Sequence, residues 1–141
     1  MTLYEKQIDL DHEKKLMEAI ARKFDFTLVK LPMKYNLDAL AFKAGNAKCF
    51  FEFKNRSHTS KRYPTAFVSL EKVMAANRIS KTTGLTCWLC VKWLDKVGVV
   101  KFDSHFEIGM GGRYDRNDPN DINIMAHYPI KGFTMLSLDL N

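Results

Sequence analysis

The chain has 141 residues, which is enough for one ordinary domain and too few for two domains with separate hydrophobic cores. Hydrophobic residues make up 46% of it, so a packed core is expected and global disorder is excluded. The formal net charge of +6 suits a polyanionic partner such as DNA or RNA, although mild basicity also serves solubility alone. We therefore predict a single domain over residues 1–141.

In the first half of the chain, the hydrophobic pattern predicts one helix followed by three strands. The helix begins near His12 with Asp11 as its N-cap, and its apolar positions from Leu16 to Phe24 follow helical spacing. The polar segment 43–48, with Gly-Asn at its centre, predicts the hairpin turn between the second and third strands. The three strands are expected over residues 26–31, 38–42 and 49–54.

The second half of the chain begins with a polar and basic segment over residues 55–65, which predicts a loop. Ser69 then caps a second helix, which runs from about Leu70 to Lys81 and ends at Gly84. A Gly- and Asp-rich loop is expected over 109–121. Strands are expected over residues 86–93, 97–102 and 122–129, with a further short one in the tail.

The order of these elements predicts the α/β fold class. A helix between a strand hairpin and a further buried strand requires a crossover, which gives a mixed β-sheet flanked by helices. Residues 103–141 are expected to form a C-terminal extension of that core.

The three cysteines do not indicate a disulfide framework, because their number is odd, and they suggest a reducing compartment. Cys87 and Cys90 lie in an apolar run, where a strand sends them to opposite faces, so we interpret them as core residues rather than metal ligands. The charged N-terminal segment predicts no signal peptide, and no apolar run reaches the length of a membrane span. We expect a cytoplasmic protein with no membrane partner.

The candidate catalytic residues are Asp38, Glu52 and Lys54. Residues 52 and 54 share one face of a strand, whereas Phe51 and Phe53 face the opposite side. The hairpin brings Asp38 toward the same edge of the sheet. Two carboxylates can bind Mg²⁺ or Mn²⁺, with the backbone carbonyl of Phe53 as a further ligand, and the ammonium can orient the attacking water. This set predicts phosphodiester cleavage.

A Glu-x-Lys pair taken alone also occurs on exposed strands as a solvated ion pair. Here the pair interrupts the apolar run Cys49-Phe50-Phe51 and follows an aspartate and a turn, which favours a functional site.

On these motifs and their order, the chain resembles the PD-(D/E)XK nuclease superfamily, and within it the archaeal Holliday junction resolvases and related phage nucleases. The family pattern is a helix bearing Glu, a strand with Asp, a strand with E-x-K, a helix and an apolar strand, and residues 12 to about 102 contain all five. One departure is Leu37-Asp38, where the family motif has proline before the aspartate. The resemblance implies a restriction-endonuclease-like core in which Asp38 and Glu52 bind metal and Lys54 assists catalysis.

The helix carboxylate of the pattern is either Glu13 or Glu18. At about 100° per residue, the apolar stripe of the helix centres near the direction of Glu13, and Glu18 points away from it. The family's helix reads Glu-x-x-Leu, which the segment from Glu13 to Leu16 matches. Glu13 is therefore the catalytic candidate, and an acidic residue that merely stabilises the first helical turn is the alternative.

The basic segment after the E-x-K motif is the candidate nucleic-acid-binding region. Arg56, Lys61 and Arg62 offer donors to phosphates, and Tyr63 can stack on a base. Lys72 is a further candidate, because a cation in the first turn of a helix works against the helix dipole. A solvated loop and a solvated surface lysine are the alternatives.

We therefore predict a Mg²⁺- or Mn²⁺-dependent endonuclease acting on DNA, including branched or recombination intermediates, in a bacterial, archaeal or phage-infected cell. RNA stays open as a substrate. A resolvase cuts two strands, so the resemblance also implies a homodimer. One alternative is a catalytically inactive nucleic-acid-binding module of the same fold in a phage or mobile-element assembly. Another is a structural protein whose charges are surface pairs.

Overall fold

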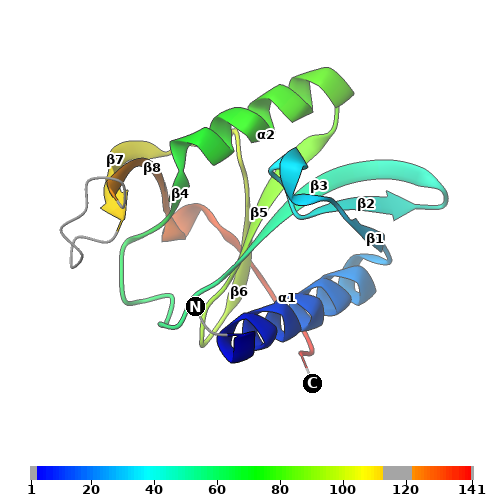
Figure 1. The fold of residues 1–141 in the computed structure, drawn as a ribbon, viewed down its shortest axis with the longest axis horizontal. Helices are drawn as coiled ribbons and strands as arrows, with labels where there is room; N and C mark the ends of the chain where they lie inside the picture. The colour runs from blue at the N-terminus through cyan, green and yellow to red at the C-terminus, as the bar shows by residue number, and fades with distance from the viewer. Residues whose placement is uncertain (1–2, 113–121, 141) are drawn as a thin grey trace.

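The computed structural model describes residues 3–112 and 122–140 (Figure 1). Six strands form the main sheet in the order β1-β2-β3-β5-β6-β9, and three form a second sheet in the order β4-β8-β7. All neighbouring strands are antiparallel except β3 and β5. The elements are α1 (Leu3–Phe24), β1 (Thr27–Lys30), η1 (Met33–Tyr35), β2 (Ala39–Lys43), β3 (Asn46–Asn55), β4 (Thr65–Ser69), α2 (Leu70–Thr83), β5 (Thr86–Lys92), β6 (Val97–Lys101), β7 (Glu107–Gly112), β8 (Ile122–Pro129), η4 (Ile130–Gly132) and β9 (Thr134–Leu136).

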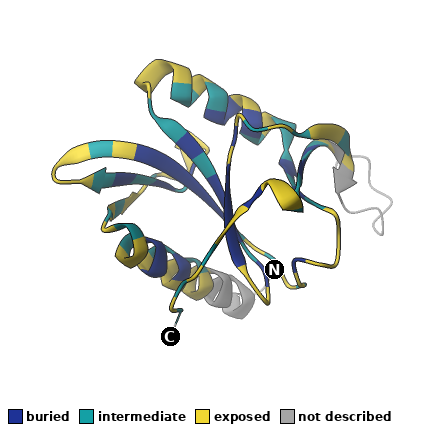
Figure 2. Ribbon diagram, turned by 180° about the vertical axis from the view of Figure 1, so that it is seen from behind, coloured by how far each residue is buried: buried dark blue, intermediate teal, exposed yellow. Residues whose placement is uncertain are grey.

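The two helices cover opposite faces of the main sheet, and each closes a hydrophobic cluster against it (Figure 1). The side chains of β3 alternate between these clusters: Phe50 packs on the α2 side, whereas Phe51 and Phe53 pack on the α1 side. Burial is concentrated in the central strands, and the tip of the β2–β3 hairpin is exposed (Figure 2). The predicted α/β class with a mixed, helix-flanked sheet is confirmed.

The β2–β3 hairpin is tighter than the predicted polar turn over 43–48. Its turn consists of Ala44 and Gly45, with φ of +52° and +79°. Positive φ at both central residues is the geometry of a two-residue turn that matches the twist of the flanking strands, and glycine is favoured there. β2 and β3 therefore run closer to the tip than expected.

The first helix is longer than predicted. It begins at Leu3, so Asp11 lies inside it and the predicted N-cap there is wrong. The preceding residues contain no proline or glycine, and nothing in them stops helix propagation.

The caps of α2 are confirmed: the Ser69 side chain accepts a hydrogen bond from the backbone N–H of Lys72 at 3.2 Å, and Gly84 ends the helix with φ of +74°.

Two strands were not predicted, and both belong to the second sheet. β4 follows the loop that was expected over 55–65, and β7 includes residues 109–112 of the loop that was expected over 109–121. Glycines have low strand propensity, so β7 is recognised only through its pairing with β8. The remainder of that loop, residues 113–121, lies outside the described residues. The short strand expected in the tail is present as β9.

The described strands after residue 103 belong to both sheets. β9 joins the main sheet beside β6, whereas β8 pairs with β4 in the second sheet. The division at residue 103 stays a prediction.

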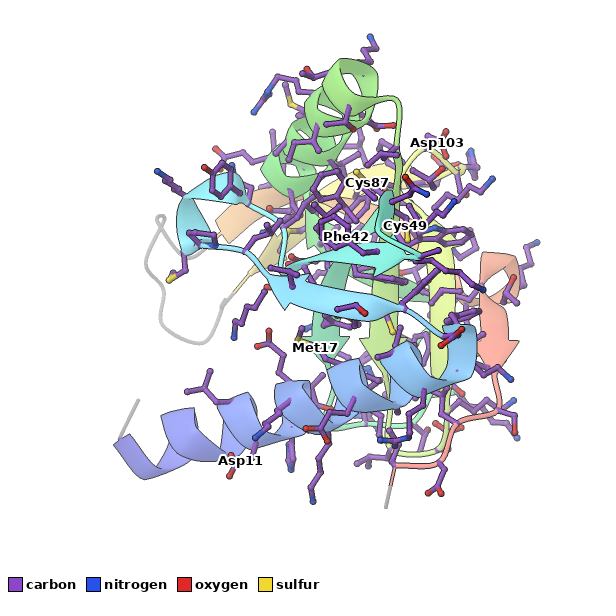
Figure 3. All side chains as sticks on the ribbon, turned by 90° about the vertical axis from the view of Figure 1, so that its right-hand side faces the viewer. Asp11, Met17, Phe42, Cys49, Cys87 and Asp103 are labelled. Atoms are coloured by element: carbon purple, nitrogen blue, oxygen red, sulfur yellow. The ribbon has the colours of Figure 1, made fainter. Side chains whose placement is uncertain are left out.

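The cysteines are free and buried, as expected for core residues. Cys87 belongs to the hydrophobic cluster between the sheet and α2, and Cys90 belongs to the cluster between the sheet and α1. The two cysteines of the C-x-x-C therefore face opposite sides of β5. Figure 3 places Cys49 and Cys87 within the body of the sheet. Among the described helices, none has the length and apolar character needed to span a membrane.

Candidate active site

Asp38 lies immediately before β2 and opposite Glu52 on β3. The register pairs Ala39 with Phe51, and the amide of Asp38 donates to the carbonyl of Phe51 at 3.0 Å, so the ladder continues one residue beyond β2. Oδ2 of Asp38 accepts a hydrogen bond from the backbone N–H of Phe53 at 2.7 Å. That bond holds the Asp38 carboxylate against the strand that carries Glu52.

Glu52 is buried, with 3% of its surface exposed, and two ammonium groups contact one of its oxygens. Nζ of Lys54 lies 3.4 Å from Oε2 of Glu52, and Nζ of Lys72 lies 3.3 Å from the same atom. Lys54 shares the α2 side of β3 with Glu52, and Lys72 comes from the first turn of α2. The structure thus brings Asp38, Glu52 and Lys54 together and adds Lys72 to them.

The other oxygen of Glu52, Oε1, is buried and has no hydrogen-bond partner among the described residues. Such an atom costs free energy unless an ion, a water molecule or a ligand contacts it. Burial, and after it the neighbouring Asp38 carboxylate, raise the pKa of Glu52 from 4.5 to about 7, against the opposing effect of Lys54 and Lys72. Two adjacent carboxylates, one with an unpartnered buried oxygen, form a place suited to a cation.

The residues at this place fit a hard divalent cation. Mg²⁺ prefers oxygen ligands, binds through one or two carboxylates and keeps several water molecules. Asp38 and Glu52 supply the two carboxylates, and Phe53 stays the predicted carbonyl ligand. Within the described ranges, no group of three or more His, Cys, Asp or Glu side chains gathers to hold a metal ion. Further ligands would therefore come from the backbone, water and substrate.

Lys72 was predicted as a nucleic-acid-binding residue, and the structure places it against the buried carboxylate. Its Nζ also donates to the backbone carbonyl of Asn36 at 2.5 Å, so the ammonium is held between η1 and Glu52. Lys72 is less exposed than Lys54, at 23% against 35%. No local pattern reveals the Asn36 contact, because 36 positions separate the two residues. The one available signal was the position of Lys72 in the first helical turn.

Glu13 is not in contact with this group in the described structure. Its carboxylate lies 3.3 Å from Nζ of Lys30, and both residues line a groove of about 410 Å³ between α1 and β1. That groove is on the α1 side of the sheet, whereas Glu52 belongs to the α2 side. Glu13 does face the sheet more than the exposed Glu18 does, as expected. Its catalytic role stays a prediction.

The basic side chains of the loop after β3 differ in their exposure to solvent. Lys61 and Arg62 are exposed, and the guanidinium of Arg62 lies 5.6 Å from the ring centroid of Tyr63. Arg56 is half-buried: its Nη2 donates to the carbonyl of Phe67 at 2.8 Å, and its guanidinium lies 5.4 Å from the Phe67 ring centroid. Lys61, Arg62 and Tyr63 are therefore free to meet a ligand, whereas Arg56 already has protein partners.

The sequence and the fold of the chain are similar to those of known proteins. A family model described as phage putative PDDEXK endonuclease matches residues 2–136. Among solved structures, the chain is similar to the 1.6 Å structure of Hjc, a Holliday junction resolvase from the archaeal hyperthermophile Archaeoglobus fulgidus. The TM-score is 0.60, with 11% sequence identity and 90% of each chain covered. At this identity the likeness concerns the fold alone. No curated protein matches the chain.

Proposed function

Because the chain belongs to the phage putative PDDEXK endonuclease family, we propose that it is a divalent-metal-dependent endonuclease acting on DNA, with Asp38, Glu52 and Lys54 in its active site. The observation that carries the proposal is the buried Glu52. One of its oxygens has no hydrogen-bond partner among the described residues, the other is paired with two lysines, and the Asp38 carboxylate is near enough to raise its pKa. A buried carboxylate next to the apolar run Cys49-Phe50-Phe51 costs stability, and a functional role accounts for it.

Each residue of the candidate active site has a separate role in the proposed cleavage. The amide of Phe53 fixes the Asp38 carboxylate, so the two acidic side chains are held ready before any ligand arrives. A bound Mg²⁺ or Mn²⁺ would polarise the phosphate and lower the pKa of a coordinated water molecule. Lys54 is exposed enough to reach substrate, and its ammonium would orient the attacking water or neutralise charge on the phosphate. Lys72 stays on Glu52 and offsets the repulsion between the carboxylates.

DNA is the proposed substrate, and branched or recombination intermediates are included because the fold is similar to that of a junction resolvase. The net charge of +6 favours a polyanionic substrate. Lys61 and Arg62 are exposed on the loop that follows β3, where they would supply phosphate contacts. We place the protein in the cytoplasm of a bacterial, archaeal or phage-infected cell.

A symmetric homodimer is proposed for the same reason, since cutting two strands of a junction requires two sites. Light scattering at micromolar concentration measures the assembly. A monomer would remove the junction-resolving part of the proposal and leave the nuclease part in place.

The proposal is tested by a cleavage panel. End-labelled linear duplex, single-stranded DNA, four-way junction and single-stranded RNA are each incubated with the protein in Mg²⁺, in Mn²⁺ and in EDTA. We expect cleavage of at least one DNA substrate with either metal and none in EDTA. Tight binding of DNA without cleavage under any of these conditions would favour the inactive binding module instead.

A further inference from the structure

A groove of about 470 Å³ opens where the basic loop meets β4 and β8 of the second sheet. Its walls include Arg56, His58 and Tyr63 from the loop region and Phe67 and His127 from β4 and β8. Asp38, Glu52, Lys54 and Lys72 do not line this groove, so it is distinct from the candidate active site.

The groove lies in line with the strand that carries the active site. The backbone N–H of Arg56 donates to the carbonyl of Lys92 at 2.8 Å, so the pairing of β3 with β5 continues one residue past β3. Arg56 therefore follows Lys54 on the same side of the extended chain. Arg56 lies four positions after Glu52, which is roughly 13 Å along an extended chain.

Two pairs of rings line the groove. The rings of Phe67 and His127 are tilted, with centroids 5.5 Å apart, and those of His58 and Tyr63 meet edge to face at 5.0 Å. Tyr63 is 50% exposed, so its ring is available to a ligand. Exposed aromatic rings next to cationic side chains are the combination that binds single-stranded nucleic acid, because every base has a face that can stack.

The loop that carries His58 and Tyr63 is tied to the turn between β5 and β6. Both the amide and the hydroxyl of Ser60 donate to the Asp95 carboxylate, at 2.7 and 2.8 Å. The backbone N–H of Leu94 donates to the carbonyl of His58 at 3.0 Å. These contacts hold the loop, so a ligand would meet a preformed wall and less ordering entropy would be lost on binding.

The opposite wall is fixed as well. Nδ1 of His127 lies 3.0 Å from the hydroxyl of Thr65, which orients the imidazole. The ring lies over Gly109 of β7: a Cβ at that position would be 2.9 Å from Nε2 of His127. Glycine at 109 therefore leaves the space that the His127 ring occupies.

We propose that this groove binds an unpaired nucleobase of the DNA strand that enters the active site, so that substrates with a single-stranded segment near the cut are preferred. The inference rests on the proposed function, because it requires DNA to lie across Glu52. Exposed Lys61 and Arg62 on the same loop favour a polyanionic strand over a peptide as the occupant.

The test uses the full chain in EDTA, so that binding is measured without cleavage. A blunt duplex is compared with the same duplex carrying a short single-stranded extension that contains 2-aminopurine, whose emission falls when it stacks. We expect wild type to bind the extended duplex more tightly and to quench the probe. Tyr63→Ala and His127→Ala should each weaken binding of the extended duplex by about 5- to 150-fold, a larger loss than either variant shows for the blunt duplex.

Tyr35→Ala is the matched control, because Tyr35 is also 50% exposed and lies in η1, outside the groove. It should preserve both the preference and the quenching. Equal affinity of wild type for the two duplexes, or full quenching by Tyr63→Ala, would overturn the inference. Cleavage of paired substrates in Mg²⁺ is measured in parallel. If wild type cleaves DNA but does not prefer the extended duplex, only the groove assignment is wrong. If wild type prefers the extended duplex but does not cleave DNA, only the proposed function is wrong.

Discussion

Lys54→Ala is expected to lower kcat by about 10²–10³-fold, the usual effect of removing one preorganised charge from an active site. The ammonium lies 3.4 Å from the buried Glu52, at the place where a scissile phosphate would be held. DNA affinity should change little, because one phosphate contact among several is a small share of the total. The loss should therefore appear in kcat rather than in KM.

Single-turnover cleavage and equilibrium binding of the same labelled DNA separate these effects. Lys48→Ala is the matched control, since Lys48 is an exposed lysine of the same strand. Arg62→Ala is expected to weaken binding in a salt-dependent way and to cleave normally at saturating substrate. Normal cleavage by Lys54→Ala, together with loss of cleavage by Arg62→Ala at saturation, would mean that the assigned roles are wrong.

The second large effect concerns the stability of the metal-free protein. Burial raises the pKa of Glu52 to about 7 from 4.5, so the folded state holds this proton over a pH range where the unfolded state has released it. The free energy of unfolding therefore falls as pH rises from about 4.5 to about 7. The contribution of Glu52 to this fall is about 3 kcal/mol in total. Below pH 4.5 both states are protonated, and above pH 7 both are ionised, so the contribution is constant outside this window.

Urea unfolding in EDTA at a series of pH values measures this dependence. Other carboxyl groups also titrate, so the informative quantity is the difference between wild type and Glu52→Gln. The glutamine keeps the shape of the side chain and cannot ionise, so the variant should gain stability relative to wild type as pH rises through the window. Parallel curves for the two proteins would show that Glu52 titrates normally and that its environment is not as described.

The main features of the fold could be predicted because they depend on local patterns. Alternation along β3 placed Phe51 and Phe53 opposite Glu52 and Lys54, and Ser69 and Gly84 marked the ends of α2. The second sheet could not be predicted in the same way. β7 is rich in glycine, and its pairing with β8 joins residues that no local pattern connects.

In the candidate site, too, the contacts made within one hairpin could be predicted, whereas the contacts that depend on tertiary packing could not. Asp38, Glu52 and Lys54 are joined by one hairpin, so their spacing in the chain already predicts that they meet. The position of Lys72 depends on how α2 crosses the sheet, and its contact with Asn36 depends on the path of η1. The position of Glu13 depends on how α1 packs against the sheet. The periodicity of the helix does not specify which side chains Glu13 contacts, and in the structure it pairs with Lys30.

The central claim is that Asp38 and Glu52 share a divalent cation. Crystals soaked in Mn²⁺ and measured at the manganese absorption edge test it directly. We expect an anomalous peak between the two carboxylates, within about 2.0–2.6 Å of their oxygens, and no such peak in crystals of Asp38→Asn. A wild-type structure without a peak at this place, or with the ion bound by other side chains, would contradict the assignment of the site.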